Sequence, residues 1–195
     1  MKTRNRRILS LFVIGLAAFA SAQAGNLEPP PGPVSPTPPP DTCFDNVGRY
    51  AVCGDGTVKD NLTGLIWLED ANCFGAQFWA SASISAEQLA DGQCGLTDRS
   101  SPGDWRLPTI EEWQAILDQA ITNGCSNPYV PDLLGTGCCG TGTCVFSGVQ
   151  SNVYWSSTTN VTDPGLAWCS GLSGGNVGND DKSNSRYVWP IRGGP

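Results

Sequence analysis

Nine cysteines constrain this chain more than any other feature, because covalent cross-links limit which segments can lie together. Cysteines of an exported chain mostly form disulfides, and an odd number leaves at least one thiol that is free or bonded to another chain. Cys43–Cys53 and Cys73–Cys94 each bracket a local element, so we predict these two bridges. The pairing of the others stays open, and they are Cys125, Cys138, Cys139, Cys144 and Cys169.

Residues 1–24 have the three parts of a secretory signal peptide. Basic residues between Lys2 and Arg7 precede an apolar stretch from Ile8 to Ala20, and a small-x-small cleavage signal ends at Ala24. The apolar stretch is shorter than the roughly 20 residues that a membrane-spanning helix needs. We therefore predict an exported chain that does not span a membrane and lies in the periplasm, at the cell surface or outside the cell. The pattern indicates no particular oligomeric state.

A proline-rich linker follows at residues 25–40, where eight residues are proline. Such segments adopt an extended polyproline conformation of about 3 Å per residue. The linker is either a stalk or a plain N-terminal tail, because composition does not separate the two. Residues 41–195, about 155 in number, are enough for one domain with a single core.

Composition excludes several functions. Removal of residues 1–24 takes away four of the 11 Lys and Arg residues and none of the 18 Asp and Glu residues, which leaves a net charge of −11. That charge repels nucleic acid, anionic lipid and sulfated polysaccharides, and it suits neutral glycans, cationic partners or calcium. The chain has no histidine, so the usual general base and the commonest zinc ligand are missing.

Short apolar runs separated by turns predict an α+β domain. Thr57-Val58 and residues 65–68 flank a turn at residues 61–64, a pattern typical of paired strands. Apolar residues at a spacing of three to four predict a helix over 79–89. We expect two helices, short antiparallel sheets and long disulfide-stapled loops; the remaining expected segments are a loop over 125–148 and strands at 153–155, 167–169 and 187–189.

The second helix has the clearest start and stop signals. Thr109 followed three residues later by Glu112 forms a capping box, and Glu111 adds a negative charge near the helix N-terminus. Gly124 supplies the stop. One apolar face recurs through Ile110, Trp113, Ile116, Leu117 and Ala120.

Four motifs in a fixed order give the chain a family resemblance. They are GDGTVKDNLTGLIW at 54–67, GDWRLPT at 103–109, YWSSTT at 154–159, and DDKS at 180–183 followed by YVWPIRGG at 187–194. Together they resemble the Lcl C-terminal domain family. The resemblance implies a C-type-lectin-like or formylglycine-generating-enzyme-like fold. In that superfamily the Arg-Leu-Pro-Thr segment is structural, so we expect Asp104 and Arg106 to form an internal ion pair or a backbone-bonding set.

Two aromatic residues and one polar loop are candidate binding sites. Most of the seven tryptophans lie in apolar segments and predict core. Trp168 and Trp189 stand beside polar loops and are candidate ligand-facing rings. Asp180, Asp181 and Asn184 are further ligand candidates. Asn179, Asp180 and Asp181 could supply oxygens to calcium, and the alternative is a solvated turn.

Three functions compete on this sequence. The resemblance implies a non-catalytic binding or adhesion module for a glycan or a surface protein, because the family's namesake is a surface adhesin. A structural or assembly subunit of an envelope or surface complex is the alternative. A formylglycine-generating-type oxidase would need two cysteines late in the domain, and neither is matched here. The vicinal pair Cys138-Cys139 reads as ordinary disulfide cysteines. We expect no catalytic residue and no cofactor other than calcium.

Overall fold

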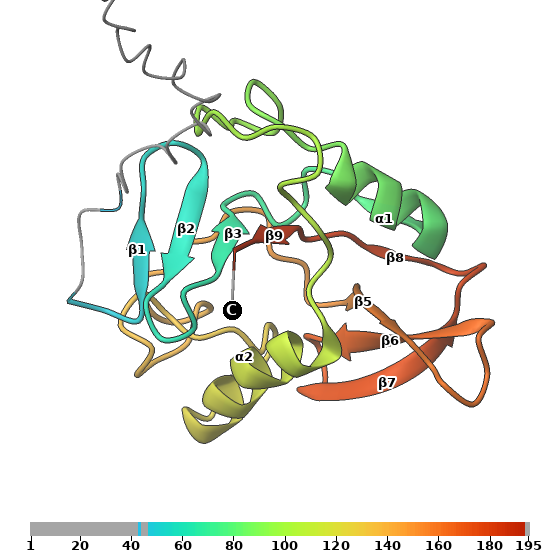
Figure 1. Ribbon diagram of the computed structural model, residues 1–195. Coiled ribbons are helices and arrows are strands. Elements are labelled where there is room, and N and C mark those ends of the chain that lie inside the picture. The colour runs from blue at the N-terminus through green and yellow to red at the C-terminus, as the bar shows by residue number, and fades with distance from the viewer. Residues whose placement is uncertain (1–42, 44–46, 194–195) are drawn as a thin grey trace, which may run out of the picture. The chain divides into compact units, whose positions relative to one another are not determined.

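Turn chemistry and alternating apolar residues build the first of two sheets. The computed structural model describes residues 43 and 47–193, so the predicted signal peptide (1–24) and linker (25–40) lie outside the described residues. Strands β1 (Tyr50–Val52), β2 (Thr57–Asp60) and β3 (Ile66–Leu68) form an antiparallel meander. Strand β9 (Ile191–Arg192), from the opposite end of the described chain, pairs with β3 (Figure 1).

The second sheet has five strands in the order β4-β8-β5-β6-β7. All its pairings are antiparallel except β5 with β8, which is parallel. The sheet is mainly antiparallel, as the sequence predicted, and the β5–β8 pair, in which β8 lies on the side of β5 that β6 does not occupy, is the exception. The strands are β4 (Ala76–Phe78), β5 (Val153–Thr159), β6 (Leu166–Gly171), β7 (Asn176–Asp181) and β8 (Ser185–Tyr187).

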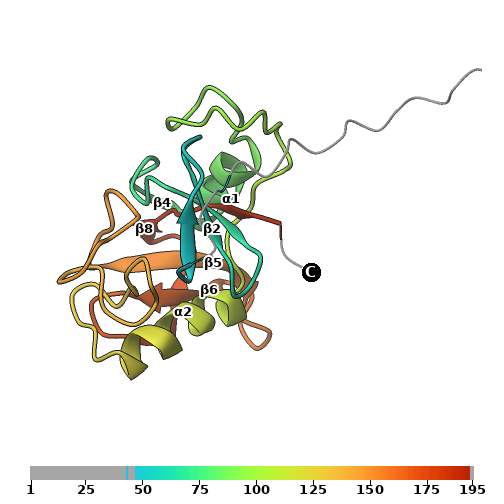
Figure 2. The same ribbon diagram turned by 90° about the vertical axis from the view of Figure 1, so that its left-hand side faces the viewer.

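Two helices lie on opposite sides of the five-stranded sheet (Figures 1 and 2). Helix α2 (Ile110–Thr122) begins with the predicted capping box, and Gly124 follows its end with φ of 72°. Helix α1 (Trp79–Glu87) has no side-chain cap and no acidic residue in its first turn. It is held by packing instead, since its buried residues Ala82 and Ala86 face the sheet. Both predicted helices are confirmed.

Two hydrophobic clusters fill the faces of this sheet. The larger one contains an aromatic core of five residues on the α2 side, and the smaller one packs α1 against Trp155, Ala167 and Cys169. Trp189 occupies the centre of the aromatic core, with ring centroids 4.9–5.8 Å from four other rings. Those four rings belong to Trp67, Trp113, Phe146 and Tyr154.

Four disulfides join the long loops to these elements. Two of them are the predicted bridges, Cys43–Cys53 and Cys73–Cys94. The vicinal cysteines bond to separate partners, as Cys125–Cys138 and Cys139–Cys144. Cys169 on β6 is the free thiol, and it is buried. The α+β class with two helices and disulfide-stapled loops is therefore confirmed. No helix in the described ranges is long and apolar enough to cross a membrane.

Candidate functional site

Burial separates the tryptophans into two groups. Five of the seven are at most 1 % exposed. Trp189 is one of these five, with its indole N–H donating to the Leu68 carbonyl at 2.7 Å. The prediction that Trp189 faces a ligand is therefore wrong, because its ring lies at the centre of the aromatic core. Only Trp79 and Trp168 are partly exposed.

Trp79 is engaged inside the protein. Its indole nitrogen donates to the Ser156 carbonyl at 2.8 Å. The ammonium of Lys182 lies 4.0 Å from its ring centroid and also donates to Thr159 Oγ1 at 2.8 Å. A ring that is already covered by a cation has little surface left for a ligand.

Trp168 is the exception. It belongs to neither hydrophobic cluster. Among the described residues its side chain makes no hydrogen bond, ion pair or ring contact. Its neighbours on β6, Ala167 and Cys169, are buried against the α1 side of the sheet. Because side chains alternate along a strand, the Trp168 ring lies on the α2 side.

Strand register brings two polar residues beside this ring. Trp168 pairs with Asn179, and Leu166 pairs with Asp181. Directly paired residues share a face, so Asn179 and Asp181 lie on the same face as Trp168. Both are exposed. We call these three residues the β6–β7 face. An aromatic ring with an amide and a carboxylate alongside can stack on a ligand and hydrogen-bond to it.

Asp180 points to the opposite side of β7 and serves the structure. Asn184 Nδ2 donates to its Oδ1 at 2.7 Å, and Arg186 Nε donates to its Oδ2. Burial would raise the pKa of Asp180, but the hydrogen bonds from Asn184 and Arg186 lower it below its usual value. Asp180 and Asn184 are therefore bonded to each other across the β7–β8 turn, which follows directly after Asp181.

The three predicted calcium ligands do not converge. The segment is a strand rather than the expected loop, so Asn179 and Asp181 lie on one face and Asp180 on the other. The Asp181 carboxylate accepts a hydrogen bond from the Ser183 backbone at 2.8 Å, which lowers its pKa. Within residues 43 and 47–193, no group of three or more Cys, Asp or Glu side chains is placed to hold a metal ion. Calcium as a cofactor stays a prediction.

The free thiol lies behind the β6–β7 face. Cys169 is 6 % exposed, and its sulfur donates to the Gly178 carbonyl at 3.4 Å. Burial raises the pKa of the Cys169 thiol to about 11, and the nearby Asp180 charge adds to this effect. The thiol is therefore protonated at neutral pH and is a weak nucleophile.

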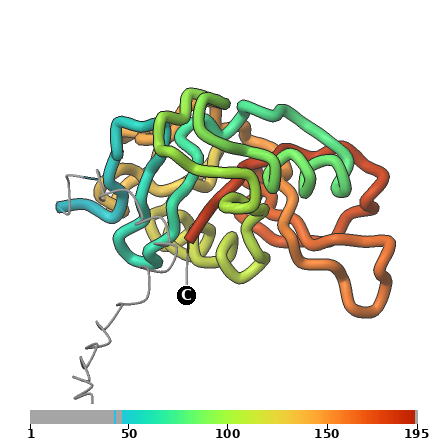
Figure 3. Tube along the Cα trace, turned by 45° about the horizontal axis from the view of Figure 1, so that its top comes forward, coloured from blue at the N-terminus to red at the C-terminus, as the bar shows by residue number. Residues whose placement is uncertain are grey.

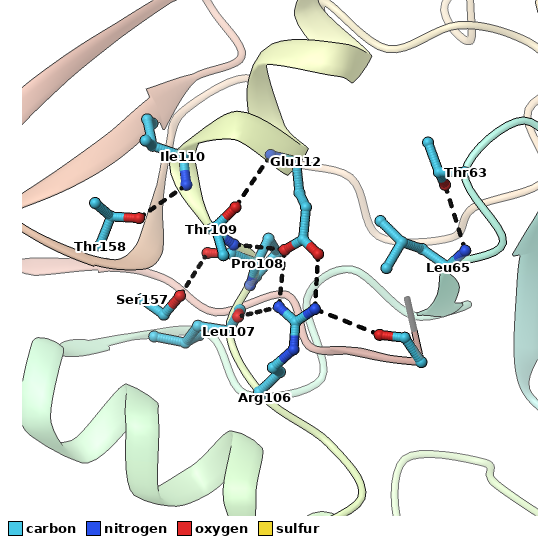
Figure 4. A network of polar contacts seen from close by, with 11 residues as sticks. Thr63, Leu65, Arg106, Leu107, Pro108, Thr109, Ile110, Glu112, Ser157 and Thr158 are labelled. Atoms are coloured by element: carbon cyan, nitrogen blue, oxygen red, sulfur yellow. Dashed lines mark hydrogen bonds and ion pairs between the residues drawn. The ribbon is translucent and has the colours of Figure 1, made fainter. Parts of the chain in front are cut away.

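The Arg-Leu-Pro-Thr motif forms the entrance to α2 (Figure 4). Both terminal nitrogens of Arg106 donate to the Glu112 carboxylate, at 2.8 and 2.6 Å. The same carboxylate accepts from the Thr109 backbone at 2.6 Å, and Thr109 Oγ1 accepts from the Glu112 backbone. Asp104 is not the partner of Arg106, because its carboxylate accepts from the Ser101 backbone. The motif is structural, as expected, with Glu112 as the partner that the prediction missed.

The fold and these residues define a disulfide-stapled α+β domain with an Arg-Leu-Pro-Thr entrance to its second helix. The model of the Lcl C-terminal domain matches residues 56–192, more than two thirds of the chain. The chain belongs to the Lcl C-terminal domain family. A comparison with curated proteins finds no match.

Proposed function

We propose that this chain is an exported, non-catalytic binding or adhesion module that presents the β6–β7 face to a glycan or a surface partner. The observation that carries the proposal is the Trp168 ring, which is partly exposed, lies outside both hydrophobic clusters and stands beside Asn179 and Asp181. A partly exposed tryptophan ring that makes no hydrogen bond or ring contact among the described residues is available to stack on a ligand.

The same proposal includes export and fold superfamily. The signal-peptide pattern at residues 1–24 and the four disulfides both suit an oxidising compartment. The Arg-Leu-Pro-Thr entrance to α2 supports a C-type-lectin-like or formylglycine-generating-enzyme-like arrangement. An envelope-complex subunit linked through the odd cysteine is less well supported, since Cys169 is buried.

Binding assays on the exported protein test the proposed face. We would screen immobilised glycans with and without calcium, and compare the wild type with Trp168→Ala. Phe78→Ala is a matched control, because Phe78 is 57 % exposed and lies at the end of β4, directly before the helix α1 on the other side of the sheet. Trp168→Ala should lose at least about tenfold in affinity, and Phe78→Ala should bind as the wild type does. Equal binding by Trp168→Ala and wild type would refute the proposed face.

A thiol assay tests the non-catalytic part of the proposal. An oxidase needs a reactive thiolate, whereas Cys169 is buried with its pKa raised to about 11. Native protein should therefore react negligibly with a thiol reagent at pH 7, and protein unfolded without reductant should release one thiol per chain. Rapid labelling of native protein at any cysteine would favour the oxidase.

A further inference from the structure

The domain uses most of its positive charges internally. Four of the five arginines in the described residues form ion pairs, with Asp60, Glu112, Asp180 and Asp98 as partners. Lys182 is held between the Trp79 ring and Thr159. These contacts leave few cations to meet an anionic ligand at the surface.

The surroundings of Trp168 are more acidic still. Strands β5, β6 and β7 and helix α2 contain no Lys or Arg. Helix α2 packs on the same side of the sheet and contributes the exposed carboxylates Glu111 and Asp118. The Ile110 backbone N–H donates to Thr158 Oγ1 at 3.0 Å, which fixes the start of α2 against β5. Asp181 on β7 adds a third exposed carboxylate, so α2 and the strands β5–β7 carry acidic side chains and no lysine or arginine, and we expect this face to favour cations.

We infer that the β6–β7 face binds a glycan that carries protonated amines, with the Trp168 ring stacking on the sugar and the Asp181 carboxylate meeting the ammonium group. This inference rests on the proposed function and names its ligand class. The face of an indole ring attracts cations, and a neighbouring carboxylate adds a charge-assisted hydrogen bond. Asn179 supplies an amide that can bond to a hydroxyl group of the sugar.

A repeating sugar fits this face better than a folded protein does. Stable protein interfaces bury about 1,200–2,000 Å² around an apolar centre. None of the exposed large hydrophobic residues in the described ranges lies on β6 or β7. One aromatic ring edged by an amide and a carboxylate is the size of a single sugar unit.

Three oligosaccharide probes separate charge from shape. Oligomers of glucosamine carry protonated amines at pH 6, oligomers of N-acetylglucosamine have the same rings without the charge, and heparin oligosaccharides are polyanionic. We would measure their affinities for the full exported chain by calorimetry at low and high salt. The glucosamine oligomer should bind about tenfold more tightly than its acetylated analogue, and salt should reduce the difference.

Two variants assign the effect to residues. Asp181→Asn should remove most of the preference for the amine while leaving binding of the acetylated oligomer unchanged, and Trp168→Ala should weaken both. Glu87→Gln is the matched control, because Glu87 is an exposed carboxylate at the end of α1 on the other side of the sheet.

The outcomes distinguish the two levels of the proposal. The protein could prefer the N-acetylglucosamine oligomer or heparin while its binding still depends on Trp168. That result would overturn the amine inference but would still support the proposed binding module. Tighter Trp168-dependent binding of a lysine-rich peptide than of any glycan would overturn the glycan assignment. If the protein binds none of these probes, the amine inference is overturned. If Trp168→Ala binds the immobilised glycans as tightly as the wild type does, the proposed function itself is contradicted.

Discussion

The aromatic core and the β6–β7 face use tryptophan in opposite ways. In the core, Trp189 touches four rings and is fully buried. On the β6–β7 face, Trp168 has no ring partner among the described residues and keeps part of its surface exposed. The difference arises from what covers each residue. Trp189 lies under strands of both sheets and under α2, whereas Trp168 packs against neither hydrophobic cluster and lies on a strand whose other side packs on α1.

Removal of the central ring should have the largest effect. Trp189→Ala would leave a cavity among four aromatic rings and an unpaired Leu68 carbonyl, so we expect a loss of about 3–5 kcal/mol in the free energy of unfolding. Denaturant titration measures this change. Trp189→Phe, which keeps a ring, should lose clearly less. A loss under about 1 kcal/mol for the alanine variant would mean that the core does not depend on Trp189.

The entrance to α2 should show an intermediate effect. Glu112→Ala removes the Arg106 pair and half of the capping box, and we expect a loss of about 1–3 kcal/mol. Glu112→Gln keeps an acceptor for the Thr109 backbone and should lose about 1 kcal/mol, because Arg106 is partly exposed and water screens the pair. If the two variants lose equally, the capping bond contributes nothing.

At acidic pH the Glu112 carboxylate should no longer contribute to the free energy of unfolding. Burial would raise the pKa of Glu112, but the hydrogen bond from Arg106, the bonds at Thr109 and the Arg106 charge lower it below its usual value. The group is therefore more easily protonated in the unfolded chain. Its contribution is present above the unfolded pKa and is lost as pH falls through the folded pKa. The stability gap between wild type and Glu112→Gln should narrow below about pH 4.5.

The sequence predicted local structure better than it predicted which side chains become buried by distant segments. The capping box at Thr109 and Glu112, the helix at 79–89 and the turn at 61–64 all depend on residues that are close in the chain, and all are present. The burial of Trp189 depends on rings from four distant segments, so a local pattern could not reveal it.

Strand β7 shows the same limit at the candidate site. Its glycine, asparagine and aspartate residues have low strand propensity and resemble a loop. Pairing with β6 overrides that propensity. As a result, the oxygen-bearing side chains point to opposite faces of the strand, with Asn179 and Asp181 on one face and Asp180 on the other. The alternation of Val177, Asn179 and Asp181 was a signal for the strand, but it is weak where only one of the three residues is apolar.

Substitution of Trp168 should change stability least. This small change is what would separate the β6–β7 face from the aromatic core. Trp168→Ala removes a partly exposed ring that belongs to neither hydrophobic cluster, so we expect the free energy of unfolding to fall by less than about 1 kcal/mol. Denaturant titration beside Trp189→Ala gives the contrast directly, and the binding assay on the same preparation shows whether affinity is lost while the fold is kept. A loss as large as that of Trp189→Ala would make Trp168 part of the core, and the β6–β7 face would no longer support a binding function.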